Sequence, residues 1–392
     1  MEFRDLKKQY QVLRGDIDRA VLDVMAGGAY IMGPQVKELE KQLAEYVGVK
    51  HCLTCANGTD ALTLALKAWG IGPGDAVFVP DFTFFSSAEV VSLEGATPVF
   101  VDVREDTFNM DAMDLERTVN QVLADGCLRP RVIVAVDLFG LPADYKAIRA
   151  VADKYGLLIL EDGAQGFGGS IRRFPVKPGM TEDVMAGPDR PSHRACSFGD
   201  ISTTSFFPAK PVGCYGDGGA VFTDSDEWAA LIESYRVHGK GQFKYDNVRI
   251  GLNSRLDTVQ AAILQVKLKA FIDYELDAVN AAAERYTGLL GDMVGTPVIP
   301  DGYRSSWAQY TIRLANKQQR DGLQAHLKSL GIPSMVYYPK PMHLQTAFAA
   351  CGGRDCPVAT GLCDRVLSLP MHPYLTEEQI ASVCGAIHDY LR

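Results

Sequence analysis

Short apolar runs alternate with amphipathic stretches from about residue 50 to residue 237. The runs have the length of buried strands, and the stretches between them repeat apolar positions every three to four residues, as helices do. Uninterrupted apolar strands separated by helices favour a mostly parallel sheet covered on both faces. Helices are expected at about 60–69, 111–124, 143–155 and 226–237. The expected strands are His51–Thr54, Ala76–Pro80, Pro98–Asp102, Val132–Asp137, Leu157–Leu160, Ile201–Phe206 and Gly219–Thr223.

The pattern changes after Arg255. A helical pattern without proline runs from Thr258 to about Leu289 and is typical of a connector between domains. The elements expected beyond it are an alternating segment at Ala308–Leu314 and helices near 317–329 and 376–391. We therefore predict an α/β chain with a large domain at 1–257, including an N-terminal arm, and a connector helix with a smaller α+β domain at 258–392.

Composition and charge exclude several classes of partner. The 392 residues carry a net charge of −9 without a prominent basic run, which argues against nucleic acid. The polar start lacks the apolar core of a signal peptide, and no run of about 18 apolar residues is present, so we expect a cytoplasmic protein with no membrane partner. Nine scattered cysteines predict free thiols. His238, His343 and His372 are not spaced as ligands on one helix, so no metal site is predicted.

A lysine and an aspartate carry the main candidate chemistry. Lys210 ends the segment Ser205–Lys210, where proline and glycine on either side favour desolvation of its amine. Desolvation lowers the pKa of a lysine and makes it a nucleophile toward an aldehyde. Upstream, the apolar strand Leu158–Asp162 ends in a carboxylate. A pyridoxal 5′-phosphate (PLP) enzyme needs a lysine that forms a Schiff base and an aspartate that keeps the pyridine nitrogen protonated. The two residues therefore predict PLP as the cofactor.

Five further residues could contact such a cofactor, and each has a structural alternative. Gly58 and Thr59 begin a helix, whose N-terminus suits a phosphate, although the same motif is also an ordinary N-cap. Gln165 could reach a ring hydroxyl three residues after the strand-end aspartate, which could instead only cap the next turn. Phe84 could stack on the pyridine or belong to the core. Ser205 could donate to the phosphate or be a buried structural serine.

Two other segments leave alternatives open. Asn253 could simply cap the long helix that follows it. Arg255 is a forked donor suited to a carboxylate or phosphate, and it could instead pair with Asp257. The segment 172–194 contains four prolines and little periodicity, so it is either surface decoration or an active-site lid.

The order of these motifs resembles the DegT/StrS family of sugar aminotransferases nearly end to end. The segments that carry the resemblance are Tyr30–Pro34, Asn57–Leu62, Glu161–Gln165, Ser205–Lys210, Gly251–Arg255 and Pro370–Pro373. The resemblance implies the aspartate-aminotransferase-like fold of PLP enzymes (fold type I) and a homodimer with shared active sites. It implies that Lys210 binds the cofactor covalently and carries the proton. The other implied contacts are Asp162 to the pyridine nitrogen, Gln165 to the ring hydroxyl, Phe84 stacked on the ring, Gly58, Thr59 and Ser205 to the phosphate, and Asn253 from the second subunit.

Within the family, the segments Ser205–Gly219 and Asn253–Arg255 are most similar to enzymes that aminate UDP-2-acetamido-2-deoxy-3-oxo-glucuronate. This similarity implies transfer of an amino group from L-glutamate, which leaves as 2-oxoglutarate, to C3 of a nucleotide sugar for surface polysaccharide or lipopolysaccharide. Arg255 would bind the uronate carboxylate or that of the amino donor. Another 3-oxo or 4-oxo dTDP-, UDP- or GDP-deoxysugar stays open as the substrate, as does a PLP-binding regulatory protein without turnover.

Overall fold

The computed structural model describes residues 1–172, 193–243, 245–351 and 353–392. Its central sheet consists of β1 (His51–Cys55), β2 (Asp75–Pro80), β3 (Thr97–Val101), β4 (Arg129–Val136), β5 (Leu158–Asp162), β8 (Ile201–Ser205) and β9 (Gly219–Thr223). The spatial order of these seven strands is β1-β9-β8-β5-β4-β2-β3. Strand β9 runs antiparallel to both of its neighbours, and the other strands share one direction. The predicted mostly parallel α/β sheet is therefore confirmed.

Alternate residues of the central strands pack into different apolar clusters on the two faces of the sheet. In β2, Val77 and Val79 lie in one cluster, whereas Ala76 and Phe78 lie in another. Successive side chains of a strand point to opposite faces, so a strand covered on both sides reads as a continuous apolar run. The first face is covered by α3 (Gly58–Ala68), α4 (Ser86–Leu93), α7 (Asp226–Tyr235) and α11 (Pro357–Arg365), and the second by α5 (Ala112–Asp125) and α6 (Tyr145–Tyr155).

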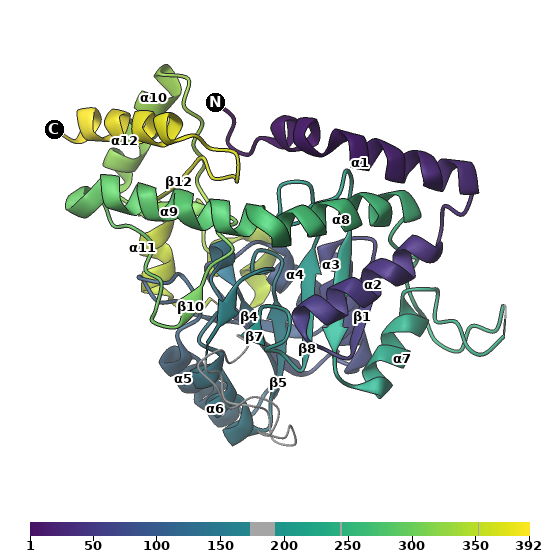
Figure 1. The fold of residues 1–392 in the computed structure, drawn as a ribbon. Helices are drawn as coiled ribbons and strands as arrows, with labels where there is room; N and C mark the ends of the chain where they lie inside the picture. Colours follow the sequence, from purple (N-terminus) through teal and green to yellow (C-terminus); the bar gives the residue numbers. More distant parts are fainter. Residues whose placement is uncertain (173–192, 244, 352) are drawn as a thin grey trace.

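A long helical run crosses the molecule beside the sheet (Figure 1). It consists of α8 (Thr258–Ala270), a π-helical turn at Phe271–Glu275 and α9 (Leu276–Leu290), which confirms the helical pattern predicted for this region. Helices α1 (Leu6–Gly27) and α2 (Pro34–Val47) pack against α8, and α12 (Glu377–Leu391) packs against α9. One apolar cluster contains residues of both α2 and α12. The core is thus continuous across residue 257, and the division into domains at that point stays a prediction.

The C-terminal part contains a strand in the predicted alternating segment and both of the predicted helices, α10 (Lys317–Ser329) and α12. Strands β11 (Tyr310–Arg313) and β12 (Val366–Leu369) form an antiparallel pair, and α10 lies between them in sequence. Helices α1, α2, α4 and α11 have no counterpart among the helices expected from the sequence. Helix α1 fully buries only Gln9, Ile17 and Val24, so its apolar stripe is too thin to reveal the helix.

A small sheet completes the fold. Its strands are β6 (Ser170–Ile171), β7 (His193–Arg194) and β10 (Tyr303–Arg304), all paired antiparallel. Residues 173–192, which make up most of the proline-rich segment singled out in the sequence, lie outside the described residues, so both readings of that segment stay open. Within the described residues, no helix combines the length and the apolar character that crossing a membrane requires.

Candidate active site

A cavity of about 480 Å³ lies where the parallel strands end. Strands β4, β5 and β8 each contribute a residue from their carboxyl ends, which is where open α/β sheets bind ligands. Helix α3 and the segment after β2 supply further walls. Seven of the nine residues singled out in the sequence line this cavity, namely Gly58, Thr59, Phe84, Asp162, Gln165, Ser205 and Lys210. The strand-to-loop junctions therefore bring together groups that are up to 152 residues apart in the sequence.

Lys210 is held by its own backbone in a tight turn after β8. Its N–H donates to the carbonyl of Phe207 at 2.9 Å, and its carbonyl accepts from Nη2 of Arg4 at 2.8 Å. Burial lowers the pKa of the Lys210 amine, the positive charge of Arg4 lowers it further, and the carboxylate of Asp162 opposes both effects. A lowered pKa leaves more of the amine neutral, which is the form that attacks an aldehyde.

Asp162 is the last residue of β5, and its carboxylate is buried against a serine. The Ser87 hydroxyl donates to Oδ2 at 2.7 Å, and the N–H of Ala164 donates to Oδ1 at 3.2 Å. Burial raises the pKa of Asp162, while these two hydrogen bonds and the nearby charge of Lys210 lower it. Such a carboxylate can pair with a protonated ring nitrogen. The sequence analysis did not identify Ser87, whose only sequence signal is its place in the segment after Phe84.

The N-terminus of α3 forms one end of the cavity. The Asn57 side chain caps the helix by accepting from the N–H of Asp60 at 2.8 Å, and the Thr59 hydroxyl lies 2.9 Å from that of Ser86. A Cβ at Gly58 would lie 2.8 Å from Cβ of Ser205, so only glycine permits this approach. Free N–H groups and clustered hydroxyls at a helix N-terminus suit a phosphate.

Gln165 and Tyr338 form the opposite wall. The Gln165 carboxamide donates from Nε2 to the Tyr338 hydroxyl at 3.0 Å, and its Oε1 accepts from the N–H of Phe139 at 2.6 Å. The ring of Tyr338 lies 6.2 Å from that of Phe84, measured between centroids. Phe84 is 54% exposed, so its face is free for a flat ligand. Tyr338 lies more than 170 residues from Gln165 in the sequence, and no local motif predicts that the two are in contact.

Asn253 and Arg255 do not line this cavity. Both lie between β9 and α8, where the guanidinium of Arg255 donates to Oδ1 of Asn253. The Asn253 side chain does not cap α8, and Asn253 is exposed. Within one chain, these two residues are therefore separate from the other seven.

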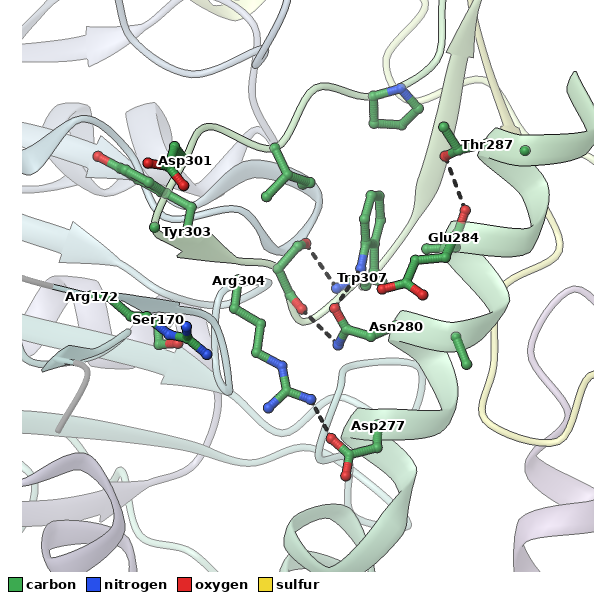
Figure 2. Close-up of a pocket in the computed structure, with 17 residues that line it drawn as sticks. Ser170, Arg172, Asp277, Asn280, Glu284, Thr287, Asp301, Tyr303, Arg304 and Trp307 are labelled. Carbon is green, nitrogen blue, oxygen red and sulfur yellow. Dashed lines mark hydrogen bonds and ion pairs between the residues drawn. The ribbon is translucent and has the colours of Figure 1, made fainter. Parts of the chain in front are cut away.

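A second and larger cavity lies between α9 and β10 (Figure 2). It has a volume of about 1240 Å³, and none of the predicted site residues lines it. Its polar groups bind one another, since Arg304 pairs with Asp277 and the indole N–H of Trp307 donates to Oδ1 of Asn280 at 3.0 Å. Such contacts are typical of side chains that hold two elements together. The residues that could take part in a reaction line the smaller cavity.

One cluster among the described residues has the composition of a metal site. Ligand atoms of Asp81, His343 and Cys356 lie within 4.8 Å of one another. Two of the three residues form a hydrogen-bonded pair, because the Asp81 carboxyl accepts from the backbone N–H of His343 at 2.7 Å and lies 2.6 Å from Nδ1 of its ring. Burial raises the pKa of the Cys356 thiol far above its usual value, which keeps the sulfur neutral. The absence of a metal site stays a prediction from the sequence.

The residues of the smaller cavity fit PLP. They offer an amine of lowered pKa, a buried carboxylate, and a helix N-terminus with hydroxyls nearby. These groups match the aldehyde, the pyridine nitrogen and the phosphate of that cofactor.

Known proteins resemble the chain over its whole length. Residues 11–388 match the model of the DegT/DnrJ/EryC1/StrS aminotransferase family. The UDP-2-acetamido-2-deoxy-3-oxo-D-glucuronate aminotransferase of Pseudomonas aeruginosa is 42% identical over 99% of both chains. The UDP-N-acetyl-3-dehydro-alpha-D-glucosamine 3-aminotransferase of Acidithiobacillus ferrooxidans is 40% identical over 98% of this chain and 96% of the relative.

Solved structures agree with these relatives. A DegT/DnrJ/EryC1/StrS aminotransferase from Brucella abortus has a TM-score of 0.91 and 48% identity, covering 100% of this chain and 99% of its own. NtdA from Bacillus subtilis, solved with bound cofactor PMP, has a TM-score of 0.83 and 26% identity, covering 97% of this chain and 82% of its own. The chain belongs to the DegT/DnrJ/EryC1/StrS aminotransferase family and is a PLP-dependent transaminase of fold type I.

Proposed function

We propose that the chain transfers the amino group of L-glutamate to the C3 keto group of a UDP-3-oxo sugar, UDP-2-acetamido-2-deoxy-3-oxo-glucuronate. The observation that carries this substrate is the 42% identity, over 99% of both chains, with an aminotransferase named for it. The relative that is 40% identical is named for a second UDP sugar with a keto group at C3. The two names share the nucleotide, the acetamido group and the position of the keto group.

Lys210 and Asp162 would carry the chemistry at the centre of the cavity. When bound, PLP acts as an electron sink that lets the amino group move between two carbon skeletons. The Lys210 amine would hold the cofactor covalently and would then be the group that moves the proton. Asp162 pairs with the ring nitrogen, and the hydrogen bonds from Ser87 and Ala164 fix the direction of its carboxylate.

The remaining cavity residues would hold and orient the cofactor. Gly58, Thr59 and Ser205 bind the phosphate at the N-terminus of α3, where backbone N–H groups and hydroxyls converge. Phe84 stacks on the ring. Gln165 contacts the ring hydroxyl, and its Oε1 contact with the Phe139 N–H keeps the Nε2 group turned toward the cavity wall at Tyr338.

Asn253 and Arg255 would serve the cavity of a second copy of the chain in a homodimer. Asn253 is exposed and lies away from the cavity of its own chain, which favours a contact across an interface. Apolar side chains in the same region also face solvent, including Phe243 at 72% and Ile250 at 90% exposure. Such exposure is typical of surfaces that pair with a partner.

Mixed dimers test the shared site. Lys210→Ala and Asn253→Ala homodimers should both have low activity. After denaturation and renaturation of an equal mixture, one site of each hybrid dimer has both residues intact, so about a quarter of the wild-type activity should return. No recovery would place Asn253 in its own chain's site, and an active Asn253→Ala homodimer would remove its role.

A panel of sugars tests the substrate. The enzyme, PLP and L-glutamate are incubated with 3-oxo and 4-oxo UDP- and dTDP-sugars, with and without the C6 carboxylate, and aminated products are measured by mass spectrometry. The proposal expects the highest kcat/KM for the UDP-3-oxo uronate. A preference for a 4-oxo sugar would support amination at C4 instead, and would leave the transaminase assignment intact.

Substitution of Arg255 tests whether the enzyme recognises the carboxylate of the uronate sugar. If Arg255 of the second subunit binds the uronate, Arg255→Ala should lose activity on the 3-oxo uronate far more than on the neutral 3-oxo sugar. A charge-assisted hydrogen bond contributes about 1.5–3 kcal/mol, so the difference should be about 10–150-fold in kcat/KM. Equal losses on both sugars would assign Arg255 to the amino donor.

A further inference from the structure

Two carboxyl groups lie buried directly behind Asp162. Asp137 follows β4 and Glu161 lies in β5, and both are 0% exposed. In the register of these parallel strands Ala135 pairs with Glu161, so Asp137, two residues further on, lies on the same face of the sheet as Glu161. Glu161 acts on the Asp137 carboxyl, since it raises the pKa of Asp137. Two neighbouring carboxyl groups can be joined by a hydrogen bond only if a proton lies between them.

Glu161 has the surroundings of an ionised carboxylate. Its Oε2 accepts from the N–H groups of Phe198 and Gly199, at 2.7 and 3.1 Å, and from the Ser202 hydroxyl at 2.8 Å. Its Oε1 accepts from the N–H of Cys196. Several donors that converge on a carboxylate stabilise the charged form.

Asp137 has the surroundings of a neutral acid. Its Oδ1 accepts from the N–H of Ala143 at 3.0 Å and from the Tyr145 hydroxyl at 2.8 Å. In the part of the chain that the structure describes, Oδ2 has no donor. A buried carboxylate oxygen without a donor is costly, and a second carboxylate beside it makes ionisation costlier. Protonation removes both costs, because Oδ2 then becomes a donor to Glu161.

Among the described residues, the titratable groups around Asp137 on other elements are neutral, apart from Glu161. Burial and the charge of Glu161 raise the pKa of Asp137 well above its usual range. The titratable groups that face Asp137 from other elements are Tyr145 of α6, Cys196 after β7 and Tyr303 of β10, and the pKa of each is raised, so each stays neutral.

The pair is joined by backbone contacts to the residues that face the cofactor. The N–H of Asp137 donates to the carbonyl of Asp162 at 3.1 Å, and the Phe139 N–H, two residues on, donates to Gln165 Oε1 at 2.6 Å. Gly166 packs directly on the acid, since a Cβ there would lie 2.4 Å from Oδ2 of Asp137. The backbone around Asp137 is therefore linked to both Asp162 and Gln165, and the Asp137 side chain packs against Gly166 between them.

We propose that Asp137 and Glu161 share one proton, carried by Asp137, and that this pair is a positioning device for Asp162 and Gln165. The pair orients these residues through the backbone and does not touch the substrate. The importance of the pair for catalysis rests on the proposed roles of Asp162 and Gln165. The position of the proton on Asp137 does not depend on those roles.

Two neutral substitutions distinguish the partners. In Asp137→Asn the amide can donate from Nδ2 to Glu161 while Oδ1 keeps both of its donors, so folding and cofactor absorption should be retained. In Glu161→Gln an amide NH₂ must face backbone N–H groups, so thermal unfolding should occur at a clearly lower temperature at every pH. The reverse order, with Glu161→Gln tolerated and Asp137→Asn destabilised, would overturn the proposal.

The pH dependence of unfolding without cofactor gives a second readout, independent of activity. The pKa of Asp137 is raised in the folded state, so unfolding releases its proton, and this stabilising contribution is present below the unfolded pKa of about 3.9 and lost as pH rises toward the folded pKa. The unfolding constant of the wild type relative to Asp137→Asn should therefore rise by up to about tenfold per pH unit between those two values. A constant ratio from pH 4 to pH 8 would overturn the proposal.

Infrared spectroscopy of the wild type tests for the proton on Asp137 even if both variants fail to fold. A protonated carboxyl band should be present at neutral pH, and it should shift in protein labelled with ¹³C-aspartate. A band that shifts only with labelled glutamate, or no such band, would overturn the assignment. Where Asp137→Asn folds, it should lose this band while Asp162→Asn, a matched change of the neighbouring carboxyl, keeps it. A failure of the sugar panel would leave these results unaffected.

Discussion

The ring of His343 and the carboxyl group of Asp81 form a buried hydrogen-bonded pair, with Nδ1 2.6 Å from Oδ2. Asp81 directly follows β2 and leads to Phe84, while His343 follows the segment that carries Tyr338. Phe84 and Tyr338 both line the cofactor cavity. The pair therefore joins the wall after β2 to the wall supplied by the C-terminal part of the chain.

Removal of His343 should destabilise the protein. His343→Ala removes the ring that faces the buried Asp81 carboxyl and leaves it only the backbone N–H of residue 343, which should cost about 1–3 kcal/mol in the free energy of unfolding. The exposed pair of His51 with Asp226, also at 2.6 Å, provides a matched control. His51→Ala should change that free energy by less than about 1 kcal/mol. Denaturant unfolding measures both variants, and equal losses would contradict a structural role for the buried pair.

Lys210→Ala should abolish the covalent attachment of the cofactor. Wild-type protein reduced with borohydride should carry the cofactor on the peptide that contains Lys210, and the variant should not. Activity should fall by at least about 10²–10⁴-fold, the contribution of a positioned proton carrier. Lys269→Ala removes an exposed lysine paired with Asp273 and should leave both readouts unchanged. A reducible adduct that persists in Lys210→Ala would refute the assignment.

The positive charge of Arg4 should set the pH at which the cofactor attaches. Only the neutral amine of Lys210 reacts, so reconstitution of the apoprotein with PLP should become faster as pH rises toward the lysine pKa and then level off. Arg4 lowers that pKa. Arg4→Met should therefore move the rise to higher pH, and a displacement of one unit slows attachment about tenfold at a fixed lower pH. Arg4→Lys keeps the charge and should keep the wild-type profile. Identical profiles for both variants would exclude an electrostatic role.

Gly58→Ala should weaken cofactor binding specifically. The new Cβ would lie 2.8 Å from Cβ and 3.2 Å from Oγ of Ser205, which forces the phosphate end of the cavity apart. Overpacking of this kind costs about 1–3 kcal/mol, so the Kd for PLP should rise about 5–150-fold. Gly15→Ala, within α1 and with no atom within 4 Å of the new Cβ, should instead stabilise folding by about 0.5–1 kcal/mol and leave the Kd unchanged. Fluorescence titration of the apoprotein with PLP measures the Kd of both variants. An unchanged Kd for Gly58→Ala would contradict a phosphate site at the N-terminus of α3.

The sequence was most informative where a polar residue ends a buried strand. Asp162 and Ser205 end β5 and β8, and Gly58 begins the helix after β1, so a parallel sheet brings all three to one edge. Strand direction alone predicts that meeting. Ser87 and Tyr338 could not be found in the same way, because each belongs to the site through contact with a distant segment.

By itself, then, the sequence determined the mostly parallel sheet and the family, and it singled out Lys210 and Asp162 as the candidate residues for the cofactor. These results depend on periodicity and on local motifs, whose residues lie close together in the sequence. The tertiary structure alone decided which distant groups share a buried space: the pairing of Asp81 with His343, the burial of Asp137 and Glu161 on one face of the sheet, and the separation of Asn253 and Arg255 from the cavity of their own chain. Protonation and desolvation depend on every neighbour in three dimensions, so no local pattern of residues can specify them.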